Sequence, residues 1–300
     1  MNFPSREGFI PFHNFKTWYR IVGSKPDEGK YPLLCLHGGP GMSHDYLEPL
    51  GALIETGRQV VFYDQLGCGN SDHPHDPSLW SVKLYVEEVA AIRKSLGLDK
   101  VHLLGQSWGG FLAQEYMLTN PSGVLSLTLA NSASSTKRWI SEANRLRSEL
   151  PDELQQVLIK YEHAGTTQDP EYAAATDVYY RRHLCRLDPW PECLHQTLKK
   201  MGRDPEVYNT MWGPSEFHCT GSLQNWDIEE KIHAISIPTL ILSGRHDEST
   251  PAINQILQES IQNSKWVLFD DSSHTPHLEE TEKYTQTLSQ FLDHNDVREY

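Results

Sequence analysis

VHLLGQSWGG, residues 101–110, is the most informative segment of this chain. Its first four residues form an apolar run of strand length, which leads directly into the pattern Gly-x-Ser-x-Gly at 105–109. Residues 111–117 then place apolar side chains at helical spacing. Small residues two positions before and after Ser107 let the backbone turn sharply between a strand and a helix. The hydroxyl then stands above a helix N-terminus, whose dipole favours negative charge. This predicts Ser107 as a nucleophile rather than a plain helix N-cap.

Short apolar runs on both sides of this segment predict further strands. Each run is apolar on both faces, as in a parallel sheet covered by helices, and is bounded by Gly, Pro, Asp or Asn. The runs are Leu33–Leu36, Val60–Tyr63, Leu125–Leu129, Thr239–Leu242 and Trp266–Phe269. Helical spacing is seen over 82–96, where Gly97 is placed to end the helix, and over 251–263 and 278–293. This alternation predicts an α/β fold with a doubly wound, mostly parallel sheet.

Residues 135–225 interrupt the alternation. They contain no convincing strand, their apolar residues recur at helical spacing, and aromatic residues are dense. We expect most of these aromatic side chains to form the segment's own core. The sequence therefore predicts a core formed by residues 1–134 and 226–300, with residues 135–225 inserted as a helical cap.

A serine hydroxyl is a weak nucleophile, so it needs a base and an acid that orients the base. In this strand–turn–helix context the expected order along the chain is Ser, then the acid, then His. Asp247 and His274 each follow a predicted strand, at the carboxyl edge where sites form in open α/β sheets. The predicted triad is therefore Ser107, Asp247 and His274. The competing candidates are His246 and His277 for the base and Glu248, Asp270 and Asp271 for the acid.

The oxyanion of the tetrahedral intermediate needs two backbone N–H donors. One is expected from Trp108, the residue after the nucleophile. The other is expected from the loop His37-Gly-Gly-Pro-Gly41, which follows the first predicted strand. Glycines let this backbone approach the substrate, and we assign the second donor to the amide of Gly39.

Composition narrows the class of function. The chain has 300 residues, of which 38% are hydrophobic, and carries 26 Lys and Arg against 40 Asp and Glu, a net charge of −14. An acidic protein is a poor partner for nucleic acid or an anionic membrane, and no apolar run is long enough to span a bilayer. The five cysteines are scattered without a C-x-x-C pair, which is typical of free thiols in a reducing compartment, and we expect the cytoplasm. No motif predicts a metal or another cofactor.

Five segments together resemble the proline iminopeptidase group of α/β-hydrolases, which includes the tricorn-interacting aminopeptidases. They are HGGPG (37–41), DQLGCGNSD (64–72), GQSWGG (105–110), GRHDEST (244–250) and DDSSHTPHLEE (270–280). The resemblance extends from Pro11 to about Phe291. It implies an α/β-hydrolase fold with a mostly helical cap. It also implies a serine exopeptidase that removes the N-terminal residue, often proline, from short peptides.

The resemblance also implies two carboxylates that bind the substrate's free ammonium group. The matching positions are Glu216, in Gly-Pro-Ser-Glu-Phe, and Glu248, directly after the predicted acid. Both residues could instead be surface carboxylates or helix caps. Leu66, Asn70 and Gln106 depart from the residues that are common in the group, which affects the expected side-chain preference. The alternative functions are an amino-acid amidase, or an esterase or lactonase of the same fold that acts on a small or natural-product acyl substrate.

Overall fold

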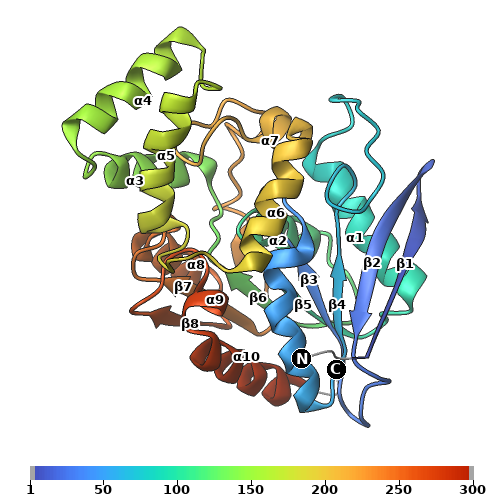
Figure 1. Ribbon diagram of the computed structural model, residues 1–300. Coiled ribbons are helices and arrows are strands. Elements are labelled where there is room, and N and C mark those ends of the chain that lie inside the picture. Colours follow the sequence, from blue (N-terminus) through green and yellow to red (C-terminus); the bar gives the residue numbers. More distant parts are fainter. Residues whose placement is uncertain (1–3, 297–300) are drawn as a thin grey trace.

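The computed structural model describes residues 4–296, and its strands form one eight-stranded sheet across the middle of Figure 1. The strands are β1 Ser5–Phe12, β2 Phe15–Val22, β3 Leu33–Leu36, β4 Val60–Tyr63, β5 Val101–Gln106, β6 Val124–Ala130, β7 Thr239–Gly244 and β8 Ser264–Phe269. Their order is β1-β2-β4-β3-β5-β6-β7-β8. Every neighbouring pair from β4 to β8 is parallel. The prediction of a mostly parallel α/β sheet is therefore confirmed.

The antiparallel hairpin β1–β2 was not expected from the sequence. It joins the sheet through antiparallel pairing of β2 with β4. Within β1, Ile10 and Phe12 are buried, whereas Phe9, which directly precedes Ile10, is 54% exposed. An edge hairpin that is covered on one face needs only alternating apolar residues, so it lacks the continuous apolar run that marks the parallel strands.

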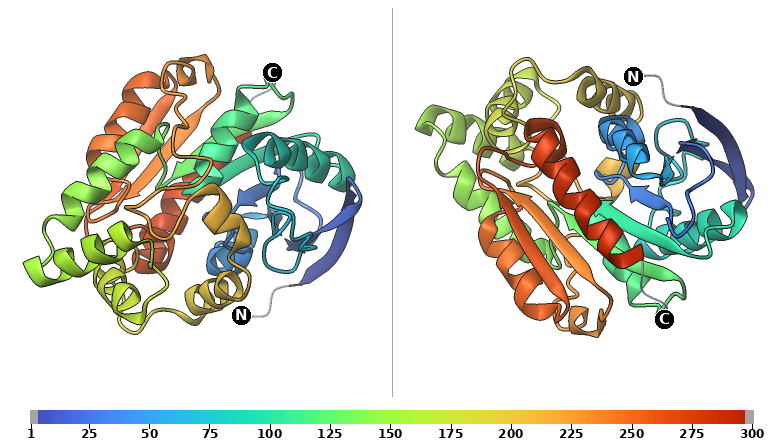
Figure 2. Two further views of the ribbon diagram at one scale, coloured as in Figure 1. Left: turned by 90° about the horizontal axis from the view of Figure 1, so that it is seen from above. Right: turned by 90° about the horizontal axis from the view of Figure 1, so that it is seen from below.

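Helices cover both faces of the sheet because successive side chains of a strand point to opposite faces. In β3, Leu33 and Cys35 belong to the core cluster that includes residues of η1 and α10, whereas Leu34 and Leu36 belong to the cluster on the other face, which includes residues of α1, α2 and α8. Figure 2 shows α10 crossing one face of the sheet. These helices are η1 His44–Thr56 (a 3₁₀ helix), α1 Val82–Leu96, α2 Trp108–Met117, α8 Pro251–Ser260 and α10 Thr281–Asp296.

The ends of the predicted helices differ slightly from the observed ends. Gly97 ends α1 in a left-handed conformation with φ of 66°, as expected. The pattern over 278–293 corresponds to two helices, a short α9 (Pro276–Glu279) and α10. They are separated because Glu280 leaves helical geometry with φ of −127° while its carboxylate accepts a hydrogen bond from the Ser272 hydroxyl.

Five α-helices and the short 3₁₀ helix η2 (Ile232–Ala234) lie between β6 and β7. The α-helices form the upper part of the molecule in Figure 1. They are α3 Thr136–Arg147, α4 Asp152–Ala164, α5 Pro170–His183, α6 Glu192–Arg203 and α7 Glu206–Met211. No strand occurs between residues 135 and 225, in agreement with the helical spacing there. Within residues 4–296, no helix combines the length and the apolar character needed to cross a membrane.

Candidate active site

Ser107 occupies a strained turn between β5 and α2. Its φ of 57° and ψ of −125° lie outside the regions that a side chain ordinarily allows, at a cost of about 1–3 kcal/mol. The turn is tight enough that a Cβ on Gly105 would collide with the Gly109 carbonyl oxygen, and a Cβ on Gly109 with the Leu36 carbonyl oxygen. The two glycines of the pattern are therefore required by backbone packing. The Ser107 side chain lines a cavity above the sheet.

His274 and Asp247 form a hydrogen-bonded pair beside this turn. Nδ1 of His274 lies 2.7 Å from Oδ1 of Asp247, and both side chains are buried. Asp247 also accepts hydrogen bonds from the Ser249 amide at 2.8 Å and from Asn131 Nδ2 at 2.6 Å. With the Nδ1 proton donated to Asp247, Nε2 of the imidazole is the nitrogen left to take a proton from a nucleophile.

Asn131 was not predicted as a site residue. It follows β6 directly and adopts a left-handed φ of 53°, a conformation that Asn tolerates better than most residues. Its side chain also donates to the Ser273 carbonyl at 3.3 Å. The sequence did contain a signal for Asn131. It stands two residues after the predicted strand Leu125–Leu129, at the carboxyl edge of the sheet that also carries the other candidate site residues.

The competing histidines and carboxylates lie elsewhere. His277 points its Nε2 at the Tyr46 carbonyl at 3.0 Å, and burial lowers its pKa to about 4. His246 is only partly buried and does not line the cavity. Asp270 pairs with Arg245 at the surface. Asp271 is exposed as well. Of the five rivals, only Glu248 shares the cavity with Ser107 and His274.

The loop that carries Gly39 lies over the serine. Gly39 lines the cavity with a φ of 113°. The amide of the preceding Gly38 donates to the Tyr46 hydroxyl at 2.8 Å, so it is already engaged. The Tyr46 hydroxyl donates in turn to Gln106 Oε1 at 2.5 Å, and Gln106 Nε2 donates to the His274 carbonyl at 3.1 Å. Gln106 therefore connects the glycine loop to the backbone of the histidine.

Gln65 ties the glycine loop to Trp108. The Trp108 indole N–H donates to Gln65 Oε1 at 2.9 Å, and Gln65 Nε2 donates to the His37 carbonyl at 2.9 Å. The Gln65 amide donates to His37 Nε2, also at 2.9 Å. The segments that hold the Gly39 and Trp108 amides are therefore joined by one side chain from the loop after β4.

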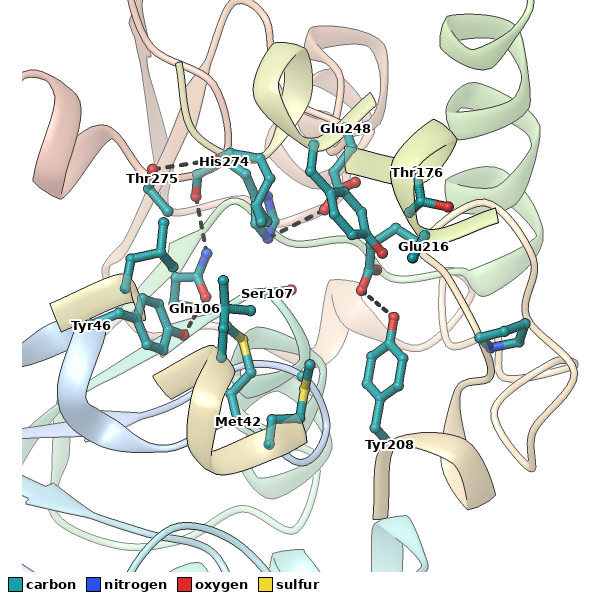
Figure 3. Close-up of a pocket in the computed structure, with 18 of the residues that line it drawn as sticks. Met42, Tyr46, Gln106, Ser107, Thr176, Tyr208, Glu216, Glu248, His274 and Thr275 are labelled. Carbon is teal, nitrogen blue, oxygen red and sulfur yellow. Dashed lines mark hydrogen bonds and ion pairs between the residues drawn. The ribbon is translucent and has the colours of Figure 1, made fainter. Parts of the chain in front are cut away.

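The cavity has a volume of about 270 Å³ and two chemically different ends. Figure 3 shows Ser107 and His274 in its middle, with Glu216, Glu248, Thr176 and Tyr208 toward one end. Met42 and Tyr46 lie toward the opposite end. A substrate bound at Ser107 therefore meets negative charge on one side and apolar side chains on the other.

Glu216 and Glu248 form the acidic end. Glu216 accepts a hydrogen bond from the Tyr208 hydroxyl at 2.7 Å, and burial raises its pKa to about 7. Glu248 is fully buried, and among the described residues neither of its carboxylate oxygens has a hydrogen-bond partner. Burial, and then the charges of Glu216 and Asp247, raise the pKa of Glu248 well above its ordinary value. A buried carboxylate without a donor is costly, and a bound cation would relieve that cost.

Comparison with known proteins gives matches over nearly the whole chain. The family model for the alpha/beta hydrolase fold matches residues 31–281. A proline iminopeptidase from Clostridium botulinum (strain Hall) is 42% identical over 293 residues, which cover 97% of this chain and 99% of that protein.

Two solved structures are similar along the same length. VinJ is 41% identical with a TM-score of 0.94, and the match covers 97% of this chain and 99% of VinJ. The proline iminopeptidase of Mycobacterium smegmatis is 38% identical with a TM-score of 0.90 and the same coverage of both chains. The similarity thus includes sequence and structure, and it extends through the helices between β6 and β7.

Proposed function

The chain belongs to the proline iminopeptidases of the alpha/beta hydrolase fold, and we propose that it is a serine exopeptidase that releases an N-terminal proline from short peptides. Amino-acid amides are substrates of the same reaction, since only the leaving amine differs. The family names come from relatives of about the same length, so the proposal applies to the whole chain.

The strongest support is the position of Glu248. Its carboxylate is buried and accepts no hydrogen bond from any residue within 4–296. It shares one cavity with Glu216 and Ser107, and its Oε1 lies 3.9 Å from His274 Nε2. Two carboxylates that are kept out of water favour a ligand with positive charge. The free ammonium group of a peptide N-terminus meets this requirement, whereas an acylated N-terminus or a simple ester does not.

The proposed mechanism uses Ser107, His274 and Asp247 as the triad. Ser107 attacks the carbonyl of the first residue while His274 Nε2 takes the hydroxyl proton, and Asp247 orients the imidazole and stabilises its cation. The amides of Gly39 and Trp108 hold the oxyanion. His274 then protonates the leaving amine, which departs and leaves an acyl-enzyme on Ser107. Water attacks this acyl group while His274 takes a proton from the water, and the imidazole returns that proton to the Ser107 oxygen as the acid product leaves.

Glu216 and Glu248 set the exopeptidase character in this proposal. Anchoring the ammonium fixes the distance between the N-terminus and the scissile carbonyl, so only the first peptide bond reaches Ser107. We also propose that residues 135–225 act as a cap, because this segment supplies Glu216 and Tyr208 to a cavity whose nucleophile comes from the sheet.

All five cysteines are free thiols, which supports the cytoplasm as the proposed compartment.

The test is release of a fluorescent amine from proline, alanine, leucine and phenylalanine conjugates, each compared with its N-acetylated form. We expect cleavage of the free-amine forms only, with proline preferred. Ser107→Ala is expected to lower kcat by about 10⁴-fold or more. Glu248→Gln is expected to lower kcat/KM by about 100-fold, because the ammonium loses a buried charged partner.

Glu259→Gln is the control for the carboxylate variant, because Glu259 is an exposed residue of α8 outside the cavity. It is expected to leave kcat/KM unchanged. Equal cleavage of free and acetylated conjugates would overturn the ammonium site. Hydrolysis of simple esters with no cleavage of any free-amine conjugate would favour the esterase alternative.

A further inference from the structure

The apolar end of the cavity has no role in the mechanism above. Met42 and Tyr46, from the segment that follows the glycine loop, lie at this end (Figure 3), and Leu194 and Leu198 of α6 belong to the same apolar cluster as these two residues. Met201, also of α6, lines the same cavity, and α6 packs against η1, which carries Tyr46. The three α6 residues recur at steps of four and three, so they share one face of the helix. Leu198 and Met201 are only partly buried, which leaves apolar surface available inside the cavity.

Polar contacts hold α6 in place against η1. Ser43, which precedes η1, donates its amide to the Thr197 hydroxyl at 2.9 Å, and that hydroxyl donates to the Ser43 carbonyl at 3.0 Å. Lys200 lies 2.8 Å from Asp45, so its charge is paired away from the cavity. The apolar face of α6 is therefore positioned before any substrate arrives, which lowers the entropic cost of binding against it.

Covalent geometry decides which part of a substrate reaches this end. With the ammonium at Glu216 and Glu248 and the carbonyl at Ser107, every ring atom of a first-position proline is within two bonds of its nitrogen or its Cα. The ring must then lie on the carboxylate side of Ser107. The scissile nitrogen is bonded to the carbonyl carbon on the other side, and whatever it carries continues away from the carboxylates.

We propose that Met42, Tyr46, Leu194, Leu198 and Met201 form a subsite for the leaving amine that selects a neutral, apolar group. This inference rests on the proposed function and deepens it. No Lys or Arg is among the described residues that line the cavity, whereas Glu216 and Glu248 are. A free carboxylate near the scissile bond would lose its hydration without gaining a cation, so amide-capped apolar peptides and alkylamides of proline are the preferred class.

The first experiment measures kcat/KM for proline methylamide, ethylamide, butylamide and hexylamide. The amines that leave from these four substrates have similar basicity. Differences in kcat/KM therefore report how the alkyl chain binds and not how readily the amine leaves. Each methylene that enters an apolar subsite is expected to raise kcat/KM by about 3-fold. Pro-Leu amide is expected to exceed Pro-Leu with a free carboxylate by about 10-fold or more.

Variants of α6 locate the effect. Leu198→Ser and Met201→Ser are each expected to lower the butylamide-to-methylamide ratio of kcat/KM by about 5-fold. Lys199→Ser is the matched control, because Lys199 is the exposed neighbour on the same helix and does not line the cavity. It is expected to keep the wild-type ratio.

The outcomes separate this inference from the proposed function. A flat chain-length series, with proline amides still cleaved only as free amines, would overturn the subsite and leave the function standing. If Leu198→Ser changed the ranking of proline, leucine and phenylalanine amides but not the chain-length ratio, the apolar end would hold the first side chain instead, which also overturns the inference. Failure to cleave any free-amine substrate would overturn both.

Discussion

Asn131 contacts the carboxylate oxygen of Asp247 that His274 does not contact. Its Nδ2 donates to Asp247 Oδ2 at 2.6 Å, in a region where both side chains are buried. A buried carboxylate oxygen that loses its donor is destabilised by about 1–3 kcal/mol, and the loss is felt in the orientation of the carboxylate. Asn131 is therefore a positioning residue in the proposed mechanism, because it acts through the acid rather than on the substrate.

We expect Asn131→Gly to lower kcat by about 10-fold, with little change in KM. Glycine is chosen because it accepts the left-handed φ of 53° without strain, so only the side chain is tested. Asn120→Gly is the matched control, since Asn120 has a similar φ of 54° and is exposed. Equal kinetics for the two variants would remove Asn131 from the mechanism.

The raised pKa of Glu216 predicts the acid side of the pH profile. Its pKa of about 7 exceeds the ordinary value of 4.5, so the carboxylate is charged above that pH and neutral below it. Binding of an ammonium needs the charged form, so kcat/KM for free-amine conjugates is expected to fall as the pH drops through about 7. An ester substrate without an amine does not depend on the two carboxylates, so its pH profile reports the triad alone. We expect kcat/KM of the amine substrate to fall more steeply toward acid pH than kcat/KM of the ester.

At the scale of elements, a buried carboxylate joins α1 to the sheet. The Thr17 hydroxyl of β2 donates to Glu88 at 2.5 Å, and the Leu66 amide from the loop after β4 donates to it at 3.0 Å. Burial raises the pKa of Glu88 to about 8, against an ordinary value of 4.5. The folded protein thus holds a proton here that the unfolded chain releases between these two pH values.

The consequence is a loss of stability with rising pH. A carboxyl group whose pKa is raised on folding makes its full contribution to the free energy of unfolding below its ordinary pKa of about 4.5. This stabilising contribution is lost as the pH rises through the folded-state pKa of about 8. Glu88→Gln is permanently neutral, so its Tm is expected to fall less than that of the wild type between pH 5 and pH 9. Glu87→Gln, at the exposed neighbouring position, is the control and is expected to follow the wild type.

The elements that the sequence predicted are those with strong local signals. The parallel strands have continuous apolar runs because both of their faces are covered, and α1 has a clear helical period and a terminal glycine. The hairpin β1–β2 was not predicted, because apolar and polar residues alternate along its strands and no continuous apolar run marks them. The separation of α9 from α10 depends on a hydrogen bond between Glu280 and Ser272, which no local pattern contains.

At the scale of the whole molecule, the last helix is anchored by Arg58 and His102, which lie 238 and 194 residues before Asp296 in the chain. Asp296 of α10 lies 3.0 Å from Arg58 Nη2 and 2.9 Å from His102 Nε2, and all three side chains are buried. Burial alone would raise the pKa of Asp296, but the hydrogen bonds from His102 and Arg58 outweigh it and lower the pKa to about 2. The stability that this carboxylate contributes is therefore fully present above its ordinary pKa of 3.8 and is lost as the pH falls from there through about 2.

Asp296→Asn is expected to destabilise the protein by about 3 kcal/mol, because Arg58 stays buried with one fewer charged partner. The measurement is the free energy of unfolding from urea denaturation near neutral pH. Asp293→Asn removes the other acidic partner of Arg58, but the Asp293 side chain is 43% exposed. Its expected loss is below about 1 kcal/mol, so equal losses for the two variants would contradict the buried anchor.

Local rules were enough to determine the fold class and the place of the proposed nucleophile. Backbone sterics require small residues around Ser107, periodicity separates strands from helices, and the strand ends bring Asp247 and His274 to one edge. These signals lie within a few residues of the groups they concern. Local rules did not identify Glu216 and Glu248. These two carboxylates were predicted only through the family resemblance, since no chemical pattern in the sequence around either one assigns it a role.

The tertiary structure alone decided what surrounds those groups. Asn131 meets Asp247, the Tyr46 hydroxyl connects Gly38 to Gln106, and α6 faces η1 across the cavity. Each of these contacts joins segments far apart in the chain, and their approach depends on how whole helices pack on the sheet. The burial of Glu248, which raises its pKa and leaves it without a hydrogen bond from the described part of the chain, is likewise a property of the packed molecule and of no single segment.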